Sequence, residues 1–186
     1  LSPAGNLLVA TSTALDDSVY IFDLVAPENS RAFAIRSQNY GGEGDDAAQY
    51  ADFLDFSNDG QYVLYDAFNV KETAGGTIGY WDINILRASD GSILRVFPPQ
   101  QPGINIGNPT FSPISDFVIA FDLVDGQGNV TVLGADLQNG VVGTIRQNGP
   151  LAGRPTFSPD ARRVAFQFLD TGGTSLGTVT LAADGV

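Results

Sequence analysis

Short runs of apolar residues recur along the chain, several of them with partial alternation of apolar and polar positions, and turn residues separate the runs. Alternation with a period of two predicts β-strands, because successive side chains of a strand point to opposite faces of a sheet. One set of runs covers residues 7–13, 62–68, 117–122 and 163–168, a second covers 19–24, 79–83, 132–137 and 178–181, and a third covers 31–36, 93–97 and 141–146. The pattern therefore predicts an all-β chain of many short strands.

A short marker with serine as its second residue precedes each run of the first set. The markers are LSPAG from Leu1, FSNDG from Phe56, FSPIS from Phe111 and FSPDA from Phe157, and their serines are 55, 55 and 46 residues apart. This spacing is close to the roughly 40–50 residues of a four-stranded propeller blade. Proline presets the first corner of a tight turn, and aspartate and glycine tolerate the left-handed geometry that follows. We therefore interpret the serines and aspartates of the markers as turn residues.

The repeat divides the chain into four units. With the marker counted as the innermost strand, a full unit has four antiparallel strands, and the units are approximately residues 1–52, 53–108, 109–154 and 155–186. An aspartate recurs in the third strand of three units, as Asp23, Asp82 and Asp136, and Thr180 stands in its place in the fourth. Each unit is therefore predicted to be one blade of a β-propeller.

At these residues the sequence resembles the TolB-like, WD-repeat-like β-propeller repeat, whose pattern is Phe-Ser-Pro-Asp-Gly, a short strand, and an Ile-Tyr-x-x-Asp-like strand. The segments 155–160 and 56–60 match it best, whereas Ile114-Ser115 replaces Asp-Gly in the third copy and Ala161 replaces Gly in the fourth. The resemblance implies a ring of six to eight blades around a central channel. It also implies a bacterial periplasmic or extracellular location. The same repeat occurs in propeller domains of some serine peptidases, so it does not decide the function.

The ends of the repeat pattern predict open edges. The first unit begins inside its innermost strand, and the last has no room for an outermost strand. About three and a half to four blades of the ring are therefore expected in this chain. Open edge strands pair with further strands. The expected partners are the remaining blades of the same protein, a partner protein, or a second copy that associates edge to edge.

Composition supports a folded domain and limits its partners. Hydrophobic residues make up 43% of the chain and charged residues only 16%, and 22 glycines and 10 prolines are consistent with many tight turns. The formal net charge of −12 argues against binding to nucleic acid or to an anionic membrane surface. Of the 21 acidic residues 18 are aspartates, which turn chemistry or an ion-rich habitat would explain. No apolar run is long enough for membrane insertion, which takes about 20 residues.

The sequence lacks the residues of most catalytic sites. It contains no histidine and no cysteine, which excludes a Ser-His-Asp triad, thiol nucleophiles, disulfides, and histidine or cysteine metal ligands within these residues. Neither the phosphate-binding GxxxxGK[ST] pattern nor the GxSxG pattern occurs. Paired carboxylates could in principle hydrolyse glycosides, but sequence does not give their separation. We therefore expect no enzyme activity and no catalytic residues in this chain.

Residues 37–50, SQNYGGEGDDAAQY, form the most unusual stretch and are predicted to be a loop from the first unit to the second. Glu43, Asp45 and Asp46 offer hard oxygen ligands between glycines, so a Ca²⁺ site is conceivable, although the spacing is not that of an EF-hand loop. A solvated acidic loop is the alternative, without any cofactor.

Three aromatic residues are also candidates for contacts. Tyr40 and Tyr50 flank the acidic loop and could contact a protein partner or a sugar ring, or could instead pack against the scaffold. Trp81 is interpreted as core or inter-blade packing.

Three functions remain open at this point. The first is a non-enzymatic propeller scaffold that binds a protein or glycan through loops on one face of the ring. The second is an accessory propeller of a secreted or periplasmic hydrolase whose catalytic domain is elsewhere. The third is a structural subunit that assembles through its open edge strands.

Overall fold

The structure is a computed structural model, and it describes residues 1–12, 16–36, 46–150 and 153–181. These residues form four antiparallel sheets and one short 3-10 helix, η1 (Pro27–Asn29). The first sheet contains β1 (Leu7–Thr11), β2 (Ser18–Asp23) and β3 (Arg31–Ala34), and the second contains β4 (Asp46–Phe56), β5 (Tyr62–Thr73), β6 (Gly76–Arg87) and β7 (Ile93–Phe97). The third contains β8 (Asn105–Phe111), β9 (Val118–Val124), β10 (Asn129–Asp136) and β11 (Val141–Pro150), and the fourth contains β12 (Gly153–Phe157), β13 (Arg163–Asp170) and β14 (Gly173–Thr180).

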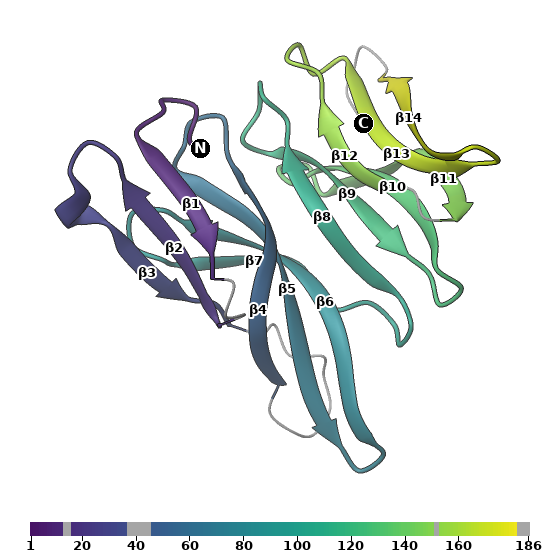
Figure 1. Ribbon diagram of the computed structural model, residues 1–186, viewed down its shortest axis with the longest axis horizontal. Helices are drawn as coiled ribbons and strands as arrows, with labels where there is room; N and C mark the ends of the chain where they lie inside the picture. The colour runs from purple at the N-terminus through teal and green to yellow at the C-terminus, as the bar shows by residue number, and fades with distance from the viewer. Residues whose placement is uncertain (13–15, 37–45, 151–152, 182–186) are drawn as a thin grey trace.

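The sheets are blades of a β-propeller, as the repeat predicts. Within each sheet the strands follow one another in chain order. The sheets stand side by side in sequence order (Figure 1), and the first strands β4, β8 and β12 contact one another in succession. The first sheet contains the second to fourth strands of a blade, and the last sheet contains the first to third. The predicted all-β class and four-stranded blades are confirmed.

Each blade has two ends. The marker turns, which join the first and second strands, lie at one end, which we call the marker end. The hairpins between second and third strands lie at the opposite end, which we call the hairpin end, together with the connections from blade to blade. The β5–β6 hairpin reaches much farther than its counterparts at the hairpin end (Figure 1).

The marker serines and aspartates close the marker turns. The hydroxyl of Ser57 accepts a hydrogen bond from the amide of Tyr62 at 3.0 Å and donates one to Asp59 at 2.6 Å. Ser158 donates to Asp160 at the same distance in the fourth blade. These bonds replace water at backbone groups that the tight turn leaves unpaired. The interpretation of these residues as turn structure is therefore confirmed.

The second blade departs from the predicted strand lengths. Its β4, β5 and β6 have 11, 12 and 12 residues, whereas the pattern indicated strands over 62–68 and 79–83. Asp82 consequently lies inside β6, and the strand end that corresponds to Asp23 and Asp136 is Arg87, which pairs with Tyr62. The predicted match of Asp82 with Asp23 and Asp136 is wrong. The pattern predicts a strand over 79–83, which puts Asp82 near its end, whereas β6 runs from Gly76 to Arg87.

The innermost strands run into the markers and begin before them. The expected unit boundaries after residues 52, 108 and 154 therefore fall inside β4, β8 and β12. The sheets divide instead at the connections 35–45, 98–104 and 151–152. A marker locates the end of an innermost strand, and the residues that open the strand carry no comparable signature.

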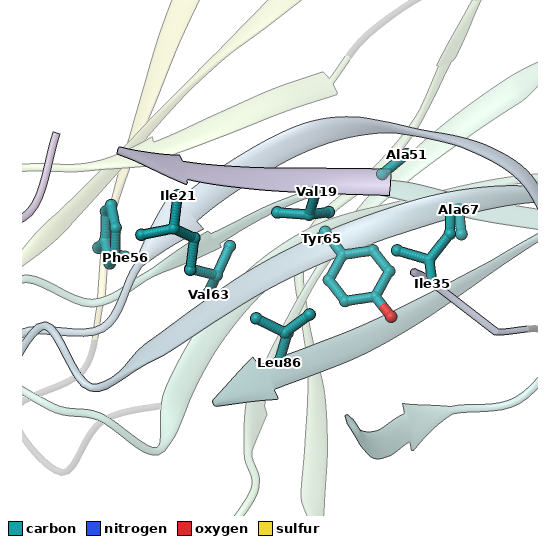
Figure 2. Packing of buried hydrophobic residues seen from close by; sticks show 9 residues of the cluster. All are labelled: Val19, Ile21, Ile35, Ala51, Phe56, Val63, Tyr65, Ala67 and Leu86. Atoms are coloured by element: carbon teal, nitrogen blue, oxygen red, sulfur yellow. The ribbon is translucent and has the colours of Figure 1, made fainter. Parts of the chain in front are cut away.

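Two apolar cores lie between adjacent blades. Val19 and Ile21 of the first blade pack with Val63, Tyr65 and Leu86 of the second (Figure 2). On the opposite face of the second blade, a separate core includes Leu64, Ile83 and Ile85 from the second blade and Ile106, Phe111, Ile119 and Phe121 from the third. Because neighbouring residues of β5 point to opposite faces, one blade contributes to both cores.

Candidate binding surface on the second blade

An aromatic cluster lies on β4 and the long β5–β6 hairpin, on the face toward the third blade. It consists of Tyr50, Phe68 and Trp81, each half-buried. The ring centroids of Tyr50 and Trp81 are 5.8 Å apart with the rings nearly perpendicular, and Phe68 lies 5.5 Å from Tyr50 and 5.3 Å from Trp81. Edge-to-face and tilted pairs at these separations hold aromatic side chains in fixed positions. The cluster is therefore a rigid, partly exposed apolar surface.

A glycine on the neighbouring strand supports this cluster. The ring of Phe68 lies over Gly79, where an added Cβ atom would be 2.7 Å from the ring. The small residue lets the ring lie flat against β6, beside Trp81. Beyond the cluster, the tip of the hairpin from Ala74 to Gly79 is exposed. The aromatic cluster thus stands at the base of an exposed hairpin.

The opposite face of the same hairpin carries a buried ion pair. The ammonium nitrogen of Lys71 is 3.4 Å from Oδ1 of Asp46, and both side chains are at most 4% exposed. The hydroxyl of Tyr80 donates a hydrogen bond to Oδ2 of Asp46 at 2.6 Å. Lys71 is the only lysine of the chain. The pair ties β4 to β5, and Tyr80 ties β6 to the same carboxylate, so all three strands are fixed behind the aromatic cluster.

Two buried aspartates near the inner strands link the second blade to the third and the third blade to the fourth. Asp66 of β5 accepts hydrogen bonds from the amide of Phe53 in its own blade and from the amide of Asn108 in the third blade, both at 2.7 Å. Asp122 of β9 accepts from the amide of Arg154 in the fourth blade at 2.8 Å. Oxygen atoms that already bind backbone amides are engaged in structure, so these carboxylates connect blades and are poorly placed to act as catalysts.

The inner strands of the third and fourth blades are shaped to receive these carboxylates. Asn108 and Arg154 both have positive φ, at 51° and 52°, within irregular steps of β8 and β12. The residues before them are Gly107 and Gly153, where a Cβ atom would collide with Asp66 and Asp122 respectively. The second blade has Asp52 at the place of these glycines, four residues before its marker phenylalanine. In the first blade, Thr11 stands at the position of Asp66 and Asp122.

Burial raises the pKa of both linking carboxyls to about 6. Desolvation is the main cause, and the backbone amides that bind Asp66 and Asp122 offset it only in part. For Asp122, Oδ2 accepts from both Arg154 and the side chain of Asn108, whereas Oδ1 is buried without a hydrogen bond among the described residues. A neutral group at this position is therefore better suited to its surroundings than a carboxylate.

The substitution Asp122→Asn is expected to stabilise the protein at pH 7.5 and to have little effect near pH 4. The folded-state pKa of about 6 exceeds the unfolded value of about 3.9, so the folded state binds the proton more tightly and stability rises as the pH falls between these values. The side-chain oxygen of asparagine can accept the same two hydrogen bonds, from the amide of Arg154 and the side chain of Asn108. Urea denaturation at the two pH values should show a gain of roughly 1–2 kcal/mol at pH 7.5. A loss at pH 7.5 would show that the ionised form is the stabilising one.

Asp160 serves as a control, because its pKa is shifted in the direction opposite to that of Asp122. It is exposed, and hydrogen bonds from Ser158 and the amide of Arg162 lower its pKa. A lowered pKa contributes stability that is present above the unfolded value and is lost as the pH falls through the folded one. The substitution Asp160→Asn should therefore lower the free energy of unfolding at neutral pH.

The structure places only part of the predicted acidic loop. Tyr40, Glu43 and Asp45 lie outside the described residues. Asp46 and Tyr50 belong to β4, so the expectation of a loop up to residue 50 is wrong: the innermost strand begins at Asp46 because it pairs with the extended end of β5 as far as Lys71. Tyr50 packs against Phe68 and Trp81, the packing alternative for this residue.

The Ca²⁺ site stays a prediction. Among the described ranges, no group of three or more acidic side chains is arranged to hold a metal ion. Of the three candidate ligands, Asp46 has its carboxylate beside the ammonium group of Lys71. A cation next to that carboxylate would meet like-charge repulsion. Sequence reasoning missed Phe68 and Lys71, although the single lysine of an acidic chain is a signal that could have been followed.

Comparison with known proteins establishes the fold and nothing more specific. No protein-family model matches the sequence, and no curated protein resembles it significantly. Among solved structures, TolB from Acinetobacter baumannii matches 97% of this chain with a TM-score of 0.61 at 19% identity. Porphyromonas gingivalis dipeptidyl peptidase 4 matches all of the chain with a TM-score of 0.58 at 12% identity, and the tricorn protease matches 96% with 0.57 at 12%. The fold is that of a TolB-like β-propeller.

The chain spans a minor part of each of these proteins. It covers 39% of TolB, 31% of the dipeptidyl peptidase and 17% of the tricorn protease. The activities named for the two peptidases therefore do not transfer to these residues. No helix among the described residues is long and apolar enough to cross a membrane.

Proposed function

We propose that this segment of a TolB-like β-propeller is a non-enzymatic scaffold that binds a protein or glycan partner through the hairpin end of its second blade. The observation that carries the proposal is the aromatic cluster of Tyr50, Phe68 and Trp81 at the base of an exposed hairpin. Tyrosine and tryptophan that are held rigidly and remain partly exposed lose little conformational entropy on binding, and they dominate many interfaces.

The geometry of the opposite face supports the same role. The buried Lys71–Asp46 pair and Tyr80 hold the three strands behind the cluster, so its position does not depend on a partner. Preorganised surfaces bind with a smaller ordering cost than mobile ones. The periplasmic or extracellular location that the repeat implies is part of this proposal, and glycans and secreted proteins are ligands found there.

A second candidate function has one specific observation in its favour. The likeness to two peptidases is compatible with an accessory propeller of a hydrolase, whose catalytic domain would lie outside this segment. The chain itself supplies no histidine or cysteine for such chemistry. A catalytic α/β domain in the parent sequence would favour this function over the free-standing scaffold.

Assembly through edge strands is the third possibility. Among the described strands, β14 pairs with β13 alone, and its Leu176 is 77% exposed. Such an edge can accept a strand from the rest of the ring or from a second copy. Light scattering after size exclusion distinguishes a monomer from a self-associated form.

Replacing Trp81 with alanine is expected to weaken binding about 10-fold or more, because central aromatic residues contribute most of the affinity at such surfaces. Calorimetric titration of panels of neutral oligosaccharides and of peptides would identify a ligand and then measure the variant. The matched control is Phe22→Ala, which removes a 41% exposed aromatic side chain from β2 of the first blade. Equal affinity of the Trp81 variant and the wild type would contradict the proposed site.

A further inference from the structure

The marker end carries a concave surface, which the proposed function does not use. It is a cavity of 410 Å³ between the outer parts of the second and third blades. Tyr62, Ile85 and Ala135 form its floor, Leu94 and Val96 of β7 line one wall, and Leu137, Val141 and Val142 of the third blade line the other. We call it the inter-blade groove.

The apolar walls of the groove are exposed. Leu94 is 50% exposed, Val142 51%, Val141 48% and Phe117, on the rim, 50%. Leu94 pairs with Ile85, and Val142 pairs with Ala135. Because Ile85 and Ala135 belong to the core between the two blades, these outer residues point toward the same space. The exposed apolar groups thus surround one groove instead of being scattered over the surface.

The corresponding groove between the first and second blades is crossed by a polar link and holds a smaller cavity of 310 Å³. There, Arg31 of β3 pairs with Ile21, which is the position that Leu94 has relative to Ile85. The guanidinium group of Arg31 donates a hydrogen bond to the carbonyl of Ser89 in the next blade. Leu94 has no group that can make this link. At this place in the repeat, a polar side chain therefore crosses one groove, whereas an exposed apolar side chain stands in the other.

Two carboxylates make the inter-blade groove negatively charged. Asp116 and Asp136 both line it. Hydrogen bonds from the side-chain amide of Asn139 and from the backbone amides of Asn139 and Gln138 lower the pKa of Asp136 and keep it ionised at neutral pH. None of the residues that line the groove is basic. A second copy of this chain, with its net charge of −12, is a poor occupant of such a surface.

We propose that the inter-blade groove binds an extended peptide segment of a partner protein in which apolar side chains alternate with lysine or arginine. The apolar side chains would fill the space between Leu94 and Val142, and the cationic groups would approach Asp116 and Asp136. Apolar burial supplies the attraction, and the opposite charges supply selectivity for basic over acidic segments.

The test is fluorescence anisotropy with a labelled synthetic decapeptide in which leucine and valine alternate with lysine. Two matched probes replace the lysines with glutamate or the apolar residues with serine. The lysine–apolar peptide should bind with a Kd on the order of 10–100 µM, at least about 10-fold more tightly than either matched probe. Equal binding of the serine probe would show attraction by net charge alone and would overturn the proposal.

Variants of the groove locate the binding. Leu94→Arg introduces the residue found at this position in the groove between the first and second blades and should lower the affinity for the peptide about 10-fold or more, whereas Arg31→Leu should leave that affinity unchanged. Asp136→Asn keeps an oxygen for the turn amides. It should lower the affinity for the peptide severalfold and make that affinity less dependent on salt. Unchanged affinity of the Leu94 variant, or self-association of the wild type that this variant abolishes, would overturn the proposal. The Trp81→Ala variant should bind the peptide normally.

Discussion

Replacing Lys71 with alanine is expected to lower the free energy of unfolding by about 3–5 kcal/mol, one of the two largest effects of a single substitution in this chain. The ammonium group lies 3.4 Å from Asp46, and neither side chain is more than 4% exposed. Removing one member leaves the other charge unpaired in a medium that solvates it poorly. The resulting loss of stability is larger than the net stabilisation that the intact ion pair provides. Urea denaturation at pH 7.5 measures the change.

The double variant Lys71→Met with Asp46→Asn is the matched control. It removes both charges, keeps the apolar stem of residue 71, and leaves an amide oxygen for the hydroxyl of Tyr80. At least half of the lost stability should return, because no unpaired charge remains. A loss below about 1 kcal/mol for Lys71→Ala would show that solvent reaches the pair and that it does not hold the hairpin.

Replacing Gly153 with alanine should cost about 3 kcal/mol or more. Gly153 has φ of 133°, a conformation that residues with a Cβ atom rarely adopt, and its added Cβ would overlap the buried carboxylate of Asp122. The carboxylate has little freedom to move, because its Oδ2 holds the amide of Arg154. Both the backbone and the link between the third and fourth blades would be disturbed.

Gly173 separates the two causes of this loss. Its φ is 119°, close to that of Gly153, and an added Cβ would meet no atom within 4 Å. Gly173→Ala therefore introduces backbone strain alone and should cost about 1–2 kcal/mol. Equal losses for the two variants would mean that the carboxylate contact at Gly153 contributes nothing.

The sequence predicts the marker turns well because their interactions are local. The side chains of Ser57 and Asp59 bond to groups within five residues of themselves, so the five-letter marker contains most of the structure it specifies. The number of strands per blade follows from the spacing of such markers. Fold class could therefore be predicted without knowing any contact between blades.

Features that depend on contacts between blades were not predictable in the same way. Asp66 and Gly107 form one link across the second and third blades, but they are 41 positions apart and each alone has an ordinary turn or strand explanation. An alignment of the repeats carries a signal, since aspartate as the fifth residue of the second strand accompanies glycine in the next inner strand twice. The length of β5 and β6 had no such signal, because Asn69 and Lys71 interrupt the apolar pattern while being buried.

The candidate site shows the same division. From the sequence, Tyr50 is predicted to flank a loop and Trp81 to pack in the core or between blades, and nothing connects the two residues. Only the pairing of β4 with β5 and β5 with β6 brings them together with Phe68. The cluster forms across three strands, and its members are 13 to 31 positions apart in sequence.

The emission of Trp81 is the most direct test of the proposed binding surface, because this residue is the only tryptophan and lies within the aromatic cluster. A ligand of the hairpin end should quench or shift the emission with the same midpoint that calorimetry gives, and it should protect the indole from acrylamide. A ligand that binds by calorimetry but leaves both the emission and the quenching of Trp81 unchanged would place the functional surface elsewhere and contradict the account.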